Sequence, residues 1–121
     1  MKTSSCKAKG RKLQKYVAEQ IGTILGMPWG KDEQIRSRGM GQSGVDVVLL
    51  GDAKEKFPWS VECKNTEKIN LWDCVKQARD NQQDGTDWLL VVKRNYETPI
   101  VVMDSMIFFK LWMRYLRLKR K

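Results

Sequence analysis

Ser-Gly-Val-Asp-Val-Val-Leu-Leu at residues 43–50 and Val-Glu-Cys-Lys at residues 61–64 decide the fold of this chain. Both stretches are rich in β-branched and apolar residues with isolated charges, which is typical of strands. Glu62 follows Asp46 by sixteen residues, and the polar segment 51–56 between the two runs is typical of a hairpin turn. We therefore predict two neighbouring antiparallel strands that place Asp46 beside Glu62.

The charged residues of these strands form a candidate metal site. Side chains alternate between the faces of a strand, so Glu62 and Lys64 share one face while Val61 and Cys63 share the other. Two carboxylates suit Mg²⁺, which binds through one or two carboxylates and keeps several waters. We predict Asp46 and Glu62 as catalytic ligands of Mg²⁺, with Mn²⁺ able to substitute.

The bound ion would polarise a phosphate and lower the pKa of a water, while Lys64 would orient that water or stabilise the developing negative charge. The same residues also fit a different interpretation, a surface ion-pair network on a sheet.

At these positions the chain resembles the PD-(D/E)XK nuclease superfamily. Val45-Asp46 stands where that family has Pro-Asp, and Glu62-Cys63-Lys64 matches its Glu-x-Lys. Within the superfamily the chain is most similar to the archaeal and phage Holliday-junction resolvases. Their Lys-Gly pair, their Arg and their Ser-Gly before the Asp correspond here to Lys9-Gly10, to Arg36 or Arg38, and to Ser43-Gly44. The resemblance extends from about residue 7 to about residue 103.

The resemblance implies one PD-(D/E)XK nuclease domain over residues 1–121. Its fold would be α/β, with a restriction-endonuclease-like core of order αβββαβ and a central mixed sheet flanked by helices. It adds Ser43 and Gln14 to the expected catalytic residues. Family members usually carry a Glu as a further metal ligand on the first helix, at the position that is Gln14 here. An amide can coordinate through its carbonyl oxygen, but it adds no charge.

Helical periodicity predicts which side of the first helix carries Gln14. In a helix over residues 8–25, an apolar stripe is formed by Leu13, Val17, Ile21, Ile24 and Leu25. Gln14 lies inside this stripe and faces the sheet, whereas Glu19 falls on the opposite side. Glu19 as a substitute ligand is the alternative; an exposed helix charge is its ordinary interpretation.

Basic residues are concentrated at the two ends of the chain. Residues 1–15 and residues 110–121 each hold six Lys or Arg and no acid, in a chain of net charge +9. Such basic ends are typical of a protein that binds a polyanion, most simply nucleic acid. Solubilising tails and a membrane-surface patch are the alternatives. The residues predicted to bind nucleic acid are Lys7, Lys9, Arg11, Lys12, Arg36, Arg38 and Gln42.

Composition excludes several other classes. The chain has no His, which excludes His-based general bases. Its three Cys, at 6, 63 and 74, lack the spacing of a zinc site or a disulfide framework. No apolar run approaches the roughly 18 residues of a membrane span, and no signal peptide is evident. We therefore expect a cytoplasmic protein that does not enter a membrane.

The remaining elements follow from the same patterns. Strands are predicted at 34–38, 45–50, 58–64, 88–92 and 100–103, and a second helix at 70–83 in which Gln77 is solvated. Asp104 or Ser105 would cap a last helix, whose mixture of aromatic and basic residues predicts a homodimer. The alternative is that these aromatics cap the core of the monomer.

The sequence thus predicts a Mg²⁺-dependent, structure-selective DNA endonuclease. Branched DNA, and above all the four-way Holliday junction, is the expected substrate. Two alternatives remain: a nuclease of the same chemistry that acts on nicked, flapped or foreign duplex DNA, and a non-catalytic nucleic-acid-binding module.

Overall fold

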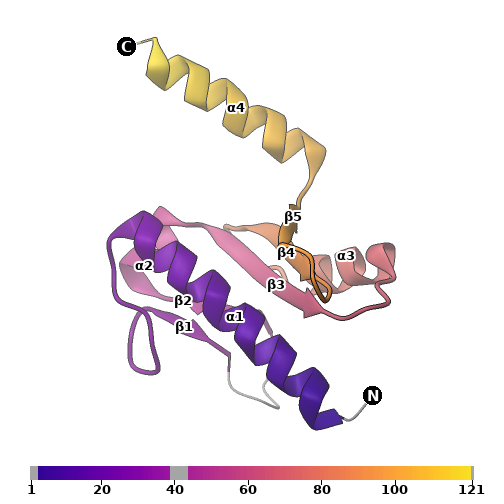
Figure 1. The fold of residues 1–121 in the computed structure, drawn as a ribbon. Coiled ribbons are helices and arrows are strands. Elements are labelled where there is room, and N and C mark those ends of the chain that lie inside the picture. Colours follow the sequence, from indigo (N-terminus) through magenta and orange to yellow (C-terminus); the bar gives the residue numbers. More distant parts are fainter. Residues whose placement is uncertain (1–2, 39–43, 121) are drawn as a thin grey trace.

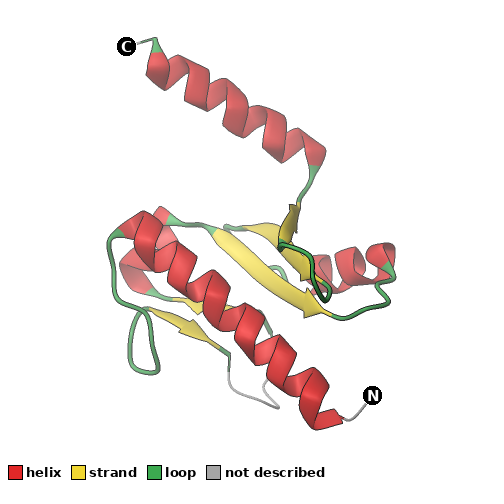
Figure 2. Cartoon of the chain, in the orientation of Figure 1, coloured by secondary structure: helices red, strands yellow, loops and turns green. Residues whose placement is uncertain are grey.

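A computed structural model describes residues 3–38 and 44–120 of the chain. The predicted site residues Gln42 and Ser43 lie outside these described residues. Figures 1 and 2 show the elements in chain order. They are α1 (Thr3–Leu25), β1 (Ile35–Ser37), β2 (Val47–Leu49), α2 (Gly51–Lys56), β3 (Trp59–Asn65), α3 (Leu71–Asp80), β4 (Asp87–Lys93), β5 (Ile100–Val102) and α4 (Ser105–Lys119).

The five strands form one mixed sheet in the order β1-β2-β3-β4-β5. β3 and β4 are parallel and are connected by α3, whereas the other three neighbouring pairs are antiparallel. The α/β class, with a mixed sheet flanked by helices, is confirmed. The sheet has more strands than the predicted αβββαβ core alone contains.

Two apolar layers hold the helices on opposite faces of the sheet. α1 packs through Leu13, Val17 and Ile21 on the face that carries Val61 and Cys63. On the other face, three buried residues of α3 pack on β4: Cys74, Val75 and Ala78 contact Trp88, Leu90 and Val92. Cys63 and Cys74 are free and buried.

α1 differs from the predicted helix at its start and in part of its stripe. It begins at Thr3 rather than at residue 8, and Ile24 is 68% exposed instead of buried. The helix ends where Gly26 adopts φ +65° and the amide of Met27 donates to the carbonyl of Gly22 at 2.9 Å. This is the hydrogen-bond pattern of a Schellman cap. Ile24 lies in the last turn of α1, where the helix approaches this cap.

The connection between β2 and β3 is a short helix, so the predicted hairpin turn at 51–56 is wrong. Ala53 of α2 is fully buried in the core, and its amide donates to Gln34 Oε1 at 3.1 Å. Gly51 begins the segment at φ +54°, a conformation that favours glycine. The two strands remain antiparallel neighbours, paired at Val47 and Val61, because register is set by burial of the strands.

α3 is shorter than predicted, since it ends at Asp80 rather than at residue 83. Its buried face contains Cys74, whereas Leu71 is 39% exposed.

α4 extends away from the sheet and has no buried residue (Figure 1). The predicted cap is present, since Asp104 Oδ1 accepts a hydrogen bond from the amide of Met106 at 2.9 Å. The alternative in which the aromatics of this helix cap the monomer core is therefore wrong, and dimerisation stays a prediction. No helix within the described ranges is long and apolar enough to cross a membrane.

Candidate active site

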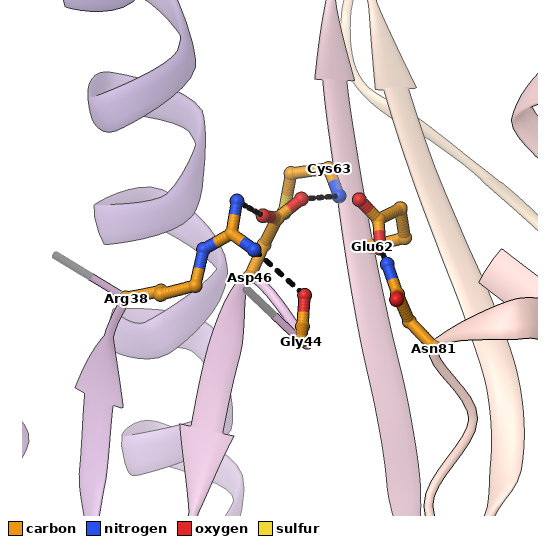
Figure 3. Close-up of polar contacts among 6 residues, drawn as sticks. All are labelled: Arg38, Gly44, Asp46, Glu62, Cys63 and Asn81. Carbon is orange, nitrogen blue, oxygen red and sulfur yellow. Dashed lines mark hydrogen bonds and ion pairs between the residues drawn. The ribbon is translucent and has the colours of Figure 1, made fainter. Parts of the chain in front are cut away.

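Asp46 is fixed at the start of β2 by contacts with both neighbouring strands (Figure 3). Its amide donates to the carbonyl of Val61 at 2.9 Å, and Cys63 donates its amide to Asp46 Oδ2 at 2.7 Å. On the other side, the Arg38 guanidinium forms an ion pair with Asp46 Oδ1 at 2.8 Å. Arg38 also donates to the carbonyl of Gly44 at 2.7 Å. The carboxylate of Asp46 is thus held between β1 and β3.

Glu62 and Lys64 lie on the same face of β3, as predicted. In the parallel register they pair with Leu90 and Val92, both of which pack against α3. Val61 and Cys63 lie on the opposite face and pack under α1. Period-two alternation of a regular strand accounts for this arrangement.

The carboxylates of Asp46 and Glu62 are close enough to interact directly. Asp46 is 3% exposed and Glu62 is 2% exposed. Burial first, and then the negative charge of Asp46 and its contact with the Glu62 carboxyl, raise the pKa of Glu62 from 4.5 to about 7, against the opposing effects of Asn81 and Arg38. Burial also raises the pKa of the Cys63 thiol, with Asp46 and Glu62 adding to the effect. Removing two carboxylates from water in this way favours binding of a proton or a cation.

Asn81 is a site residue that the sequence did not reveal. Its Nδ2 donates to Glu62 Oε2 at 3.1 Å, which fixes the carboxylate on the side away from Asp46 (Figure 3). Asn81 is the C-cap of α3. The loop that follows is anchored to β3, because the amide of Gln83 donates to Ser60 Oγ at 2.9 Å and this hydroxyl is 2.7 Å from Thr86 Oγ1.

The signal for Asn81 was present in the sequence. Asn is common where a helix ends, but the predicted helix extended through residue 83 and placed Asn81 inside it.

Lys64 lines a cavity of about 480 Å³, and neither Asp46 nor Glu62 is among the residues that line it. Gly10 of α1 and Gln77 of α3 contribute to the same cavity. Gln77 is exposed, as predicted, but it is also a neighbour of this space. Within residues 3–38 and 44–120, Lys64 forms no ion pair.

Gln14 has its side-chain oxygen on the buried side of α1. Oε1 is buried, and no hydrogen-bond partner exists for it among the described residues. One turn further along the helix Ala18 is fully buried, which agrees with a side chain directed to the sheet. Glu19 is exposed on the outer side of α1. No hydrogen bond in the described parts of the chain joins Gln14 to Asp46 or to Glu62.

The predicted nucleic-acid-binding residues fall into separate places. Arg11 and Arg36 line one groove together with Arg38, while Lys9 and Lys12 line a different cavity beside Asn65 and Lys93. Lys7 is exposed near the start of α1. Arg38 therefore contributes to both places, since it lines the groove and also forms an ion pair with Asp46.

The donor set of the site is small. In the described parts of the chain no group of three or more His, Cys, Asp or Glu could hold a metal ion. The carboxylate pair is therefore the whole set of anionic donors there, and Gln14 supplies no charge.

Comparison with known proteins gives no match to a family model, to a curated protein or to a solved structure.

Proposed function

We propose that this chain is a Mg²⁺-dependent, structure-selective DNA endonuclease of the PD-(D/E)XK type, with the four-way junction as its preferred substrate. The observation that carries the proposal is the buried pair of Asp46 and Glu62 with Lys64 on the same face as Glu62. Buried carboxylates in contact are costly unless something neutralises them. A carboxyl whose pKa is raised by burial and by a neighbouring charge, as that of Glu62 is, is a candidate for a functional site.

The element order supports the finer fold assignment. α1, β1, β2, β3, α3 and β4 follow one another in the order αβββαβ, with α2 inserted between β2 and β3. This is the order expected of a restriction-endonuclease-like core.

The residues present fit a divalent cation. Asp46 and Glu62 would hold it, and Arg38 compensates only one of their two negative charges. Each carboxylate oxygen has two lone pairs, so the partners of Asp46 leave acceptor positions open. Bound Mg²⁺ would supply polarisation of the scissile phosphate and a water of lowered pKa.

The other groups have defined tasks in this proposal. Arg38 and the Cys63 amide hold Asp46 in one orientation, and Asn81 does the same for Glu62. Lys64 stabilises negative charge that develops on the phosphate, an effect that is typically worth about 2–4 kcal/mol for one well-placed donor.

The net charge of +9 supports DNA as the partner. A second copy of the chain is the other expected partner. Nine large apolar side chains of α4 are between 37% and 68% exposed. Exposed apolar surface of this kind is typical of a protein-protein interface. A two-fold symmetric dimer would present two active sites, which suits a four-way junction in which two strands must be cut.

The test compares substrates under one set of conditions. A labelled four-way junction, a flapped duplex and a linear duplex of the same sequence are incubated with the protein in Mg²⁺, in Mn²⁺ and in EDTA. Cleavage of the junction in both metals, and of no substrate in EDTA, is expected. Preferential cleavage of the flap or the linear duplex would support the proposed chemistry but show that the four-way junction is not the preferred substrate. Binding without cleavage in any metal would identify a non-catalytic module.

A further inference from the structure

A basic groove of about 610 Å³ lies at the β1 end of the sheet, between α1 and the loop after it. Five of its lining side chains are cationic and one is anionic: Arg11, Lys15, Lys31, Arg36 and Arg38 against Asp32. Cations gathered in a concave surface raise the local concentration of a polyanion. The groove is therefore a candidate site for a phosphate backbone.

Its cations differ in what they contact. Arg36 donates through Nε to the carbonyl of Glu33 at 2.9 Å, and Arg38 is paired with Asp46. Lys15 and Lys31 are exposed and form no ion pair within the described ranges. These two lysines are thus the cations that can turn toward a phosphate without losing a partner.

An aromatic side chain lies among these cations. Trp29 lines the groove and is 38% exposed. Its backbone is fixed by a bridge to Ile35 and by the amide of Gly30, which donates to the carbonyl of Ile35 at 2.9 Å. A Cβ on Gly22 would meet the carbonyl oxygen of Met27 at 2.8 Å, so glycine is what allows this loop to lie against α1.

A partly exposed aromatic ring among cations is typical of surfaces that bind single-stranded nucleic acid. Bases stack on the ring while the cations hold the phosphates. In a duplex both faces of each base are covered by the neighbouring pairs, so stacking on Trp29 requires an unpaired base.

Arg38 connects the groove to the carboxylate pair, although neither Asp46 nor Glu62 lines the groove. Arg38 lines the groove and its guanidinium is 2.8 Å from Asp46 Oδ1. A strand held in the groove would therefore lie against the side chain that is paired with Asp46.

We propose that this groove binds an unpaired strand of a polynucleotide, with a base stacked on Trp29 and phosphates on Lys15 and Lys31. The proposal rests on the proposed function, since it assigns part of the substrate to that site. It narrows the substrate class to DNA that offers unpaired nucleotides beside the scissile bond.

The test measures binding without cleavage. The full chain in EDTA is titrated into a fluorescent oligothymidine of about 12 nucleotides, within the usual site size of single-strand binding surfaces, and into a duplex of the same length. Trp29→Ala should weaken binding of the oligothymidine by about fivefold or more and binding of the duplex by less than twofold. Trp29→Phe keeps a ring and should bind as the parent protein does.

Matched variants serve as controls for both kinds of contact. Trp72→Ala removes a tryptophan that is 72% exposed on α3, outside the groove, and should change neither affinity. Replacing Lys15 and Lys31 together by Gln should reduce the slope of log affinity against log salt by about 1.4, since each phosphate contact on a single strand contributes roughly 0.7. The same double change at Lys54 and Lys56 of α2 should leave the slope within about 0.3 of the parent value.

Three results would overturn the proposal. Equal effects of Trp29→Ala and Trp72→Ala would remove the stacking site. Equal losses on duplex and single strand would make the groove a site for duplex backbone. An unchanged slope in the double lysine variant, whose changes are exposed and leave the fold intact, would exclude the groove from binding. Because no step requires cleavage, an inactive protein that still shows the expected binding would disprove the proposed function and retain the groove.

Discussion

Replacing Glu62 by Gln should remove a pH dependence from the stability of the metal-free protein. Burial, and then the charge of Asp46, raise the pKa of Glu62 from 4.5 to about 7 in the folded protein. The folded state therefore binds this proton more tightly than the unfolded chain does. The resulting stabilisation is fully present below pH 4.5 and is lost as the pH rises through about 7.

The magnitude follows from the shift. Each pKa unit corresponds to about 1.4 kcal/mol, so the parent protein should lose about 3 kcal/mol of unfolding free energy between pH 4.5 and about pH 8 through this group. Glu62→Gln has no proton to lose at this position, so its curve lacks that decline. Subtracting the unfolding free energy of Glu62→Gln from that of the parent at each pH removes the contribution of the other titrating groups, which both proteins share.

The assay is urea unfolding in EDTA at several pH values for the parent, for Glu62→Gln and for Glu19→Gln, an exposed carboxylate on α1. The difference between the parent and Glu62→Gln should change by about 3 kcal/mol over this pH range, and the difference for Glu19→Gln should stay constant. Mg²⁺ added at pH 8 should restore the lost unfolding free energy of the parent protein but should not stabilise Glu62→Gln. A constant difference for Glu62→Gln would refute the reasoning, because the carboxylates would then be apart or solvated.

Three further predictions concern the rest of the site and α4. Lys64→Ala should lower the single-turnover cleavage rate by about 30-fold or more, the equivalent of about 2 kcal/mol, with DNA affinity nearly unchanged, since it is one cation among 23; an affinity loss at unchanged rate would place Lys64 in binding. Gln14→Glu should lower the Mg²⁺ concentration needed for half-maximal rate, because its side-chain oxygen is buried without a partner, whereas Glu19→Gln should not; the opposite pattern in a metal titration would make Glu19 the ligand. Phe109→Ser with Trp112→Ser should convert a dimer to a monomer in light scattering, since both rings are more than half exposed; an unchanged mass would exclude α4 as the interface.

The neighbouring strands and the shared face of Glu62 and Lys64 could be predicted from the sequence because they depend on local rules. Alternation fixes the face of each residue in a regular strand, and burial of Val47 and Val61 fixes which residues pair. These rules required no knowledge of how the strands are connected. The prediction therefore remained correct although the connection is α2 and not a turn.

Periodicity alone did not reveal the contacts that Asn81 and Arg38 make with the two carboxylates, because each joins residues that are distant in the sequence. Asn81 reaches Glu62 only because α3 ends at Asp80, and helix ends are decided by local capping that periodicity does not report. Arg38 was predicted to bind nucleic acid, but nothing in its sequence neighbourhood indicates that its partner is Asp46, which lies opposite it beyond the end of the β1–β2 pairing. The exposure of Ile24 also depends on tertiary structure, since the apolar stripe of a helix does not specify how far along the helix the packed sheet extends.

The central claim is that Asp46 and Glu62 together form a metal-dependent hydrolytic centre. The direct measurement is single-turnover cleavage of a four-way junction in Mg²⁺ by the parent, by Asp46→Asn and by Glu62→Gln, with junction binding measured in EDTA for each. Glu55→Gln, an exposed carboxylate of α2, is the matched control. Loss of cleavage in both site variants with retained or tighter binding, and an unaffected control, is the expected result. Full cleavage by either site variant would contradict the assignment of the pair.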